Sequence, residues 1–152
     1  MSYIASGRPD ALAYISGSKD YPSIRAKVSF FAVRDGVLVH TEASGLPAEQ
    51  PYRVFAYHIH EGESCTGNAR DPFADTLGHY NPTQKPHPYH AGDLPPLFSN
   101  NGYALSVVLT SRFVLAEIIG KTIIIHDRTD DFHSQPSGNS GNKIACGEIE
   151  PY

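Results

Sequence analysis

The sequence predicts an all-β protein, an antiparallel sandwich or barrel that forms one domain over residues 1–152. Three observations support this class. The 13 glycines and 12 prolines leave little room for long helices. Several short runs rich in β-branched and aromatic residues are separated by turn signals. No internal repeat marks a second domain, and 152 residues are enough to bury one core.

The strands of the first half follow from composition and turn chemistry. A first strand is expected at residues 11–16, which read ALAYIS. Two apolar runs then flank Arg34, Asp35 and Gly36, and Asp-Gly between such runs predicts a β-hairpin. Residues 52–60, YRVFAYHIH, are expected to form the next strand as one continuous run.

The second half combines three further strands with two long irregular segments. The strands are expected at 103–109, 121–126 and 143–149. Residues 112–119 are expected to form one or two helical turns. Residues 61–102 and 127–142 show no periodicity and are rich in turn-forming residues, so we expect long loops there, which are usually functional or disordered.

Charge and hydropathy exclude several classes of protein. A net charge of −4 argues against a nucleic-acid partner, which would require a basic surface. No stretch approaches the ~20 apolar residues of a membrane helix, so no membrane partner is expected. Residues 1–10 lack the basic start and apolar run of a signal peptide, so a cytoplasmic location is expected unless a leader was removed.

The two cysteines, Cys65 and Cys146, allow two interpretations. Composition and a cytoplasmic location favour two buried free thiols. A disulfide would instead close a long loop and stabilise the fold by about 4–5 kcal/mol in the chain-entropy model.

Eight histidines are the most informative feature of the composition. His58 and His60 lie two apart at the end of a predicted strand, so their side chains are expected to point the same way, roughly 6–7 Å apart. That spacing suits two ligands of one metal ion. Ile59 is expected to face the core with Phe55 and Tyr57. Chance placement or a polar surface face remains the alternative for such a pair.

A second group of candidate ligands lies in the first long loop. It contains three histidines and an aspartate within 15 positions: His79, His87, His90 and Asp93. Three nitrogens and one oxygen suit tetrahedral zinc, which would also order the loop. The alternative is a solvated loop rich in proline and histidine. His126 by itself reads as an ordinary half-buried histidine, and His40 and His133 are expected at the surface.

Four segments together resemble the copper/zinc superoxide dismutases over most of the chain. They are HIHEGESC (58–65), GHYNPTQKPHPYHAGDLP (78–95), IIGKTIIIHDRTDD (118–131) and QPSGNSGNKIACGEI (135–149). The resemblance implies an eight-stranded Greek-key β-barrel with long metal-binding and electrostatic loops. It also implies an antioxidant oxidoreductase that converts superoxide to oxygen and hydrogen peroxide. The Cys65 spacing is similar to that of bacterial members.

The resemblance further implies a role for each candidate residue. Copper would be held by His58, His60, His79 and His126. Zinc would be held by His79, His87, His90 and Asp93, with His79 as the bridge between the metals and as the acid that protonates peroxide. Asp130 would link ligands of the two metals from outside. Cys65 and Cys146 would form the disulfide of the family, which then becomes the favoured interpretation.

One position departs from the pattern of the family. An arginine that attracts the anionic substrate is expected three residues before the second cysteine, and Lys143 stands there instead. Lysine keeps the charge but loses the planar fork of arginine, so reduced activity is expected. The alternative is a non-enzymatic or weakly active, zinc-stabilised copper-binding protein. A zinc hydrolase is a third reading, but no carboxylate base lies beside the loop ligands. A homodimer is left open because oligomeric state varies in this family.

Overall fold

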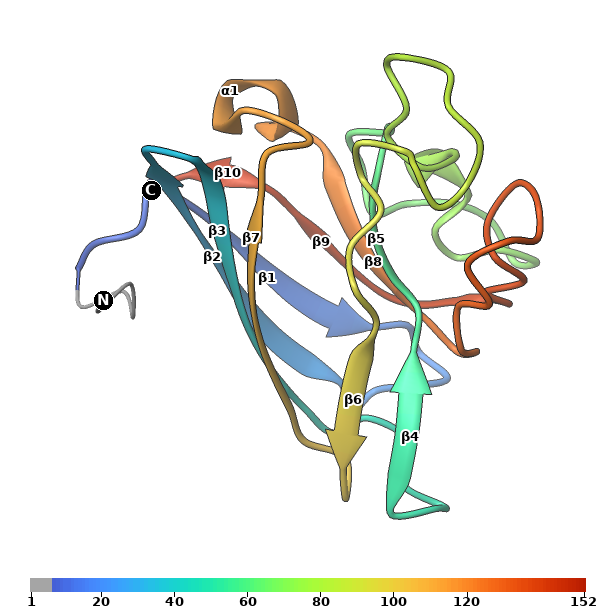
Figure 1. Cartoon of the computed structure of the whole chain (residues 1–152). Helices are drawn as coiled ribbons and strands as arrows, with labels where there is room; N and C mark the ends of the chain where they lie inside the picture. The colour runs from blue at the N-terminus through green and yellow to red at the C-terminus, as the bar shows by residue number, and fades with distance from the viewer. Residues whose placement is uncertain (1–6) are drawn as a thin grey trace.

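The computed structural model describes residues 7–152 and is nearly all-β, which confirms the predicted class. One antiparallel sheet has the order β5-β8-β9-β1-β2-β3-β7, with β10 paired to β1, and curls into a half-barrel (Figure 1). A separate two-stranded sheet, β4-β6, lies next to β7. The strands are β1 Ala11–Gly17, β2 Arg25–Val33, β3 Gly36–Ser44, β4 Tyr52–Phe55, β5 Tyr57–His60, β6 Leu97–Asn100, β7 Ala104–Thr110, β8 Thr122–His126, β9 Lys143–Glu148 and β10 Glu150–Pro151. Two short helices complete the elements, a 3-10 turn at Ala74–Thr76 and α1 at Leu115–Ile118.

The predicted β2–β3 hairpin is confirmed. The register pairs Val33 with Gly36, so Arg34 and Asp35 form a two-residue connection. Gly36 has a φ of 142°, and a Cβ atom there would lie 2.2 Å from the Thr110 carbonyl oxygen. The close approach of β7 therefore requires glycine at this position.

The prediction of one continuous strand over 52–60 is wrong. β4 ends at Phe55 and pairs with β6, whereas β5 begins at Tyr57 and pairs with β8. Ala56 lies at the break, where its N–H donates to the Arg128 carbonyl and its carbonyl accepts from the His126 N–H. These two hydrogen bonds lie where the chain passes from one sheet to the other. The position of the break is therefore determined by the segments that pair with the chain, and not by the composition of residues 52–60.

β6 was also missed, because Leu97–Asn100 falls inside the segment expected to be a loop. Four residues between Pro96 and the turn at Asn101 are too few to show an alternating pattern. The bounds of the other predicted strands agree with the structure to within two residues, and the single helical turn of α1 lies inside the segment 112–119 where it was expected.

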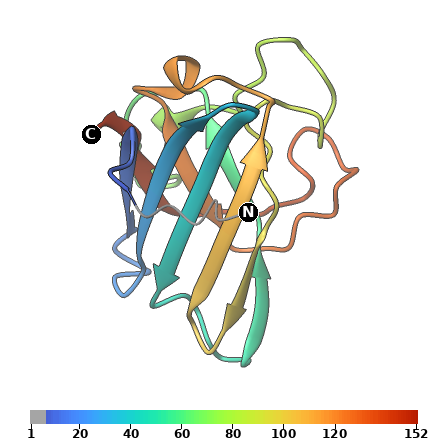
Figure 2. The same cartoon turned by 60° about the vertical axis from the view of Figure 1, so that its left-hand side comes forward.

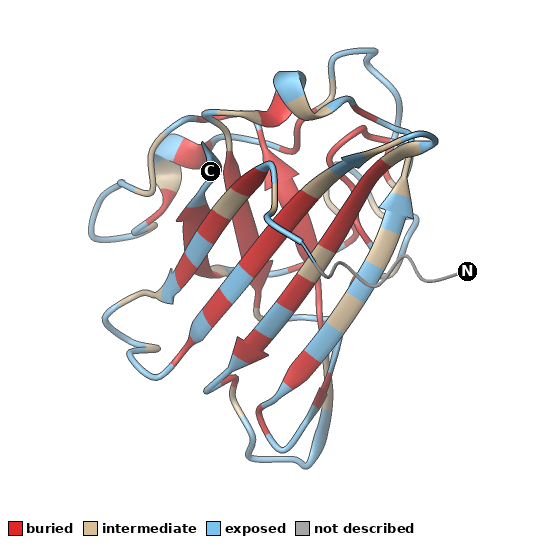
Figure 3. Ribbon diagram, turned by 90° about the vertical axis from the view of Figure 1, so that its left-hand side faces the viewer, coloured by how far each residue is buried: buried red, intermediate tan, exposed pale blue. Residues whose placement is uncertain are grey.

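The core fills the space enclosed by the curled sheet. Along β1 buried residues alternate with exposed or partly exposed ones, and along β7 exposed residues alternate with partly buried ones, which shows as colour bands along the arrows in Figure 3. β5 and β8 are buried along their whole length. Loops must therefore cover the outer face of β5 and β8, and this covered face carries the site.

Two long loops provide that cover. Residues 61–96 and 127–142 extend beyond β5 and β8 on the same side of the sheet (Figure 2). A disulfide between Cys65 and Cys146 ties the first loop to β9 with a Cα–Cα distance of 5.8 Å. The disulfide interpretation is confirmed. Within residues 7–152 no helix is long and apolar enough to cross a membrane.

Candidate metal centre

Strand alternation brings His58 and His60 to one face, as predicted. Their ring centroids are 6.5 Å apart, and both rings are buried. Tyr57 and Ile59 point to the opposite face and belong to the main hydrophobic core. His126 ends the neighbouring strand β8, and its Nε2 lies 3.2 Å from the Nε2 of His60.

The loop that contains His79 and Asp93 pairs with β5 as irregular backbone bridges. His60 lies opposite His79, and His58 lies opposite Asp93. The Ile59 N–H donates to the Gly92 carbonyl at 2.9 Å, and a Cβ atom on Gly92 would lie 2.3 Å from the Ile59 carbonyl oxygen. Backbone contact with β5 thus places two distant loop residues beside the strand histidines.

Donor atoms of the described residues converge in two groups. The first group is His58, His60, His79 and His126, and the second is His58, His79, His87 and Asp93. Within each group the donor atoms lie within 4.8 Å of one another. Both groups contain His58 and His79.

The second group also has His90 as a close neighbour. The Nδ1 of His79 lies 2.8 Å from Asp93 Oδ1 and 3.1 Å from the Nδ1 of His90. The Nδ1 of His87 lies 3.1 Å from Asp93 Oδ2, and the Nδ1 of His90 lies 3.3 Å from it. All four side chains therefore aim a donor atom at the same small volume.

Several buried nitrogens in these groups have no hydrogen-bond partner among the described residues. They are Nδ1 of His58, Nε2 of His79, Nδ1 of His87 and Nδ1 of His126. A buried polar atom without a partner costs about 1–3 kcal/mol, so four in one place need an explanation. Lone pairs that converge in this way fit metal cations, and histidine nitrogens with one carboxylate suit copper and zinc.

Asp130 joins the two groups from outside. The Nε2–H of His58 donates to its Oδ2 at 2.7 Å, and the Nε2–H of His87 donates to its Oδ1 at 2.7 Å. Each ring then offers its Nδ1 lone pair inward. Gly138 lies against this contact with a φ of 71°, and a Cβ atom there would meet Asp130 Oδ1 at 2.0 Å. Glycine is required at 138, and no local pattern in the sequence predicts that requirement.

Gln135 supports the same site through the backbone of His87. The His87 N–H donates to Gln135 Oε1 at 2.9 Å, and Gln135 Nε2 donates to the His87 carbonyl at 2.8 Å. The second long loop thereby holds the first. The two residues are 48 positions apart, so no local pattern in the sequence predicts this contact.

Burial keeps the strand histidines neutral at neutral pH. It lowers the pKa of His126 to about 3, and nearby His79 adds to the effect. Burial also lowers the pKa of His58 and His60 well below the usual value, with repulsion from neighbouring histidines as the next cause. Neutral imidazoles have the free lone pair that metal binding requires.

The pKa of Asp93 moves in the direction that suits a ligand. Burial alone would raise it, but the hydrogen bond and the charge of His79, together with the other histidines, outweigh burial and lower it. Asp93 is therefore a carboxylate at neutral pH.

Lys143 lies at the start of β9, opposite His126 in the strand register. Its ammonium group donates to the carbonyls of Phe73 at 3.2 Å and Leu77 at 3.1 Å, and lies 3.5 Å from Asp71 Oδ2. The side chain is only 15% exposed. Nothing in the sequence pointed to Asp71 as its partner.

The two remaining histidines lie outside the groups. His133 is 80% exposed in its side chain, as expected, and lies beside Asp131. His40 is 28% exposed and lies 3.8 Å from Glu42 on the face of β3 that points away from the core. Neither has the neighbours of a ligand.

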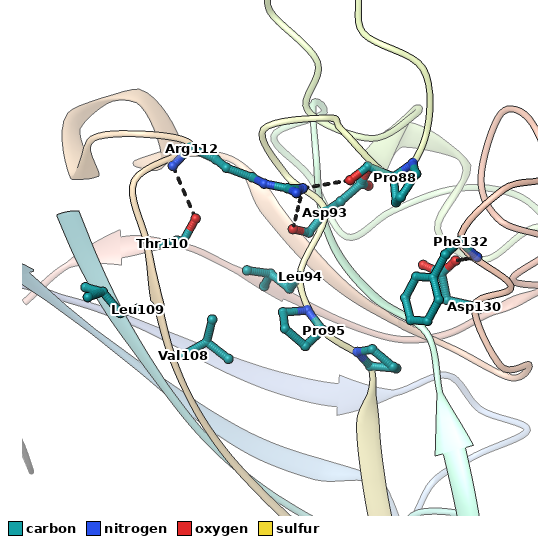
Figure 4. Close-up of a pocket in the computed structure, with 11 residues that line it drawn as sticks. Pro88, Asp93, Leu94, Pro95, Val108, Leu109, Thr110, Arg112, Asp130 and Phe132 are labelled. Carbon is teal, nitrogen blue, oxygen red and sulfur yellow. Dashed lines mark hydrogen bonds between the residues drawn. The ribbon is translucent and has the colours of Figure 1, made fainter. Parts of the chain in front are cut away.

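A mostly apolar cavity of about 370 Å³ borders Asp93 and Asp130 (Figure 4). Leu94, Pro95 and Phe132 form part of its wall. At one end the Arg112 guanidinium donates to the Pro88 carbonyl at 2.7 Å and to the His90 carbonyl at 3.2 Å. Arg112 therefore holds the loop that carries His90 rather than facing the donor atoms.

Comparisons to known proteins agree with the fold. The sequence profile of the copper/zinc superoxide dismutases matches residues 24–149, so the chain belongs to that family. It is 34% identical over 141 residues to superoxide dismutase [Cu-Zn] 1 of Aquifex aeolicus, covering 82% of this chain and 79% of the relative. It is 32% identical over 130 residues to the superoxide dismutase-like protein YojM of Bacillus subtilis, covering 76% of this chain and 63% of that one.

A solved structure shows the same fold. The Cu/Zn superoxide dismutase of Brucella abortus superposes with a TM-score of 0.77 and 25% identity, covering 92% of this chain and 99% of that one. Copper and zinc are the metals of the family, and superoxide is its substrate.

Proposed function

We propose that residues 1–152 form one superoxide dismutase domain that converts two superoxide ions and two protons to oxygen and hydrogen peroxide. Copper would be held by His58, His60, His79 and His126, and zinc by His79, His87, His90 and Asp93. The observation that carries this proposal is the position of His79, which belongs to both groups of donor atoms, with its Nδ1 against Asp93 and its Nε2 buried without a hydrogen-bond partner among the described residues.

The metals would divide the chemistry between them. Bound copper supplies one-electron oxidation and reduction, which zinc cannot supply. The protein orients the ligand rings through their other nitrogens. Asp130 accepts a hydrogen bond from His58 and from His87, and the Leu77 carbonyl accepts one from His60 Nδ1 at 2.9 Å. These acceptors select the tautomer that leaves the inward nitrogen free.

His79 would also move a proton. Its Nδ1 lies against Asp93 and His90, while its Nε2 is buried and has no hydrogen-bond partner among the described residues. Nε2 can therefore take up a proton and pass it to the departing peroxide as a general acid, while contacts on the Nδ1 side keep the ring in place.

Lys143 would supply local positive charge for an anionic substrate in a chain whose net charge is −4. Its ammonium group is already bonded to two carbonyls and paired with Asp71. This engagement favours the second candidate function, a non-enzymatic or weakly active, zinc-stabilised copper-binding protein.

Metal reconstitution distinguishes the two functions. The purified protein is stripped of metal, loaded with zinc alone or with zinc and copper, and assayed for metal content and superoxide consumption. We expect one copper and one zinc per chain and activity only after copper addition. Zinc-loaded protein that binds copper without gaining activity would refute the dismutase and support the second function.

A further inference from the structure

The ammonium group of Lys143, which lies opposite His126 in the β8–β9 register, has a partner of opposite sign. Lys143 Nζ lies 3.5 Å from Asp71 Oδ2, and the two side chains are 15% and 41% exposed. The pair joins β9 to the loop that follows Cys65. Among the described residues, Asp71 is the only carboxylate within ion-pair distance of Lys143.

Lys143 is placed to act on the histidines. It faces His126 across the β8–β9 register. Its ammonium group also shares the Leu77 carbonyl with the Nδ1 of His60. A change in the net charge at Lys143 would therefore change the electrostatic potential at His60 on β5 and at His126 on β8.

Asp71 is held in position by the turn around it. Its Oδ1 accepts from the Phe73 N–H at 2.9 Å, which leaves Oδ2 for Lys143. Its carbonyl accepts from the N–H groups of Asn68 and Ala74. The carboxylate therefore has a set orientation.

A cavity of about 540 Å³ is lined by both members of the pair. Arg70 and Asp20 add one further charge of each sign to its wall, and none of the histidines of the two groups lines it. Charges on the wall of such a cavity act on ions that enter it more strongly than charges in open water do, because less water screens them.

We propose that Asp71 is a positioning residue that lowers the attraction of the metal centre for anions by neutralising Lys143. The proposal rests on the proposed function for its substrate, superoxide, but it concerns any small anion. Lys143 alone would carry one positive charge. The net charge of the Lys143–Asp71 pair is zero, so the pair has no net charge that attracts a distant anion. Asp71 thereby limits the affinity for the anionic substrate that Lys143 would otherwise provide.

Azide titration of the protein loaded with copper and zinc tests this inference, followed through the copper(II) absorption spectrum. Asp71→Asn keeps an acceptor for the Phe73 N–H and removes the charge. We expect roughly three- to tenfold tighter azide binding at about 20 mM ionic strength, the size of effect that one partly screened charge produces. The difference should shrink towards none at about 0.5 M salt.

Asp75→Asn is the matched control. Asp75 lies in the same loop and changes the net charge equally, but its carboxylate bonds to the Thr66 hydroxyl and not to Lys143. Its azide affinity should stay within about twofold of the parent protein. Equal effects of the two variants, or no effect of Asp71→Asn, would overturn the proposal.

A double-mutant cycle separates charge from structure. Lys143→Met should weaken azide binding because it leaves Asp71 unpaired, and adding Asp71→Asn should restore the parent affinity to within about twofold. Failure of that restoration would also overturn the proposal. If Asp71→Asn does not retain both metals, Asp71→Ser replaces it, since its hydroxyl still accepts from the Phe73 N–H.

Metal content and loop exchange are measured for every variant. Hydrogen exchange of residues 66–78 reports whether the loop has opened. If Asp71 has a structural role, its replacement should speed exchange in this loop, whereas a pure charge effect should leave exchange unchanged. Azide affinity needs no turnover. An inactive protein that shows the azide pattern would refute the dismutase alone, and an active protein without the pattern would refute this inference alone.

Discussion

Replacing Asp130 by asparagine should weaken both metal sites at once. The carboxylate accepts two hydrogen bonds of 2.7 Å, one from His58 and one from His87, and is 3% exposed. Asparagine keeps one acceptor and presents an N–H₂ group to the other ring. The bond to one ring is then lost, about 1.5–3 kcal/mol, and the bond to the other ring is weakened because its acceptor is now a neutral amide oxygen. That energy corresponds to about 10- to 150-fold in metal affinity, in line with the effect of other such substitutions.

Competition with a chromophoric chelator measures the affinity for zinc and for copper in turn. Asp131→Asn is the control, because Asp131 is adjacent and loses the same charge but bonds to Ser134 and His133 instead of the buried histidines. We expect its affinities to stay within about twofold of the parent protein. The reasoning is refuted if Asp130→Asn keeps both affinities, or if the two variants lose them equally.

Three further predictions follow from the site. His79→Ala should reduce zinc affinity and abolish copper-dependent activity, because His79 belongs to both groups of donor atoms. The exposed control His133→Ala should change neither property. Full zinc occupancy together with full activity in His79→Ala would exclude the bridge. Lys143→Arg should leave metal content unchanged and raise the rate at low ionic strength, and an unchanged or lower rate would count against a steering role. The metal-free protein should lose stability as pH falls below about 6.5, because the β5 and β8 histidines have lowered pKa values in the folded state and the unfolded chain binds more protons. The slope is at most about 1.4 kcal/mol per pH unit for each histidine, and a urea midpoint that stays flat between about pH 7.5 and 5.5 would contradict it.

Local patterns predicted a large part of the fold and the candidate site. The β2–β3 hairpin follows from a turn of two residues, and the common direction of His58 and His60 follows from the alternation of a strand. Both depend only on neighbours along the chain. The break at Ala56 depends instead on hydrogen bonds to residues near 126–128, so the run 52–60 could not reveal it.

The sequence by itself determined the all-β class, the ligand types and their grouping along the chain, because composition, turn chemistry and residue spacing are local properties. Only the tertiary structure decided which atoms meet. It placed His58 and His79 in both groups of donor atoms and set Asp130 between His58 and His87. It also set Asp71 against Lys143, 72 positions later in the chain. Such contacts arise from strand register and loop packing, which bring together residues whose separation along the chain carries no signal.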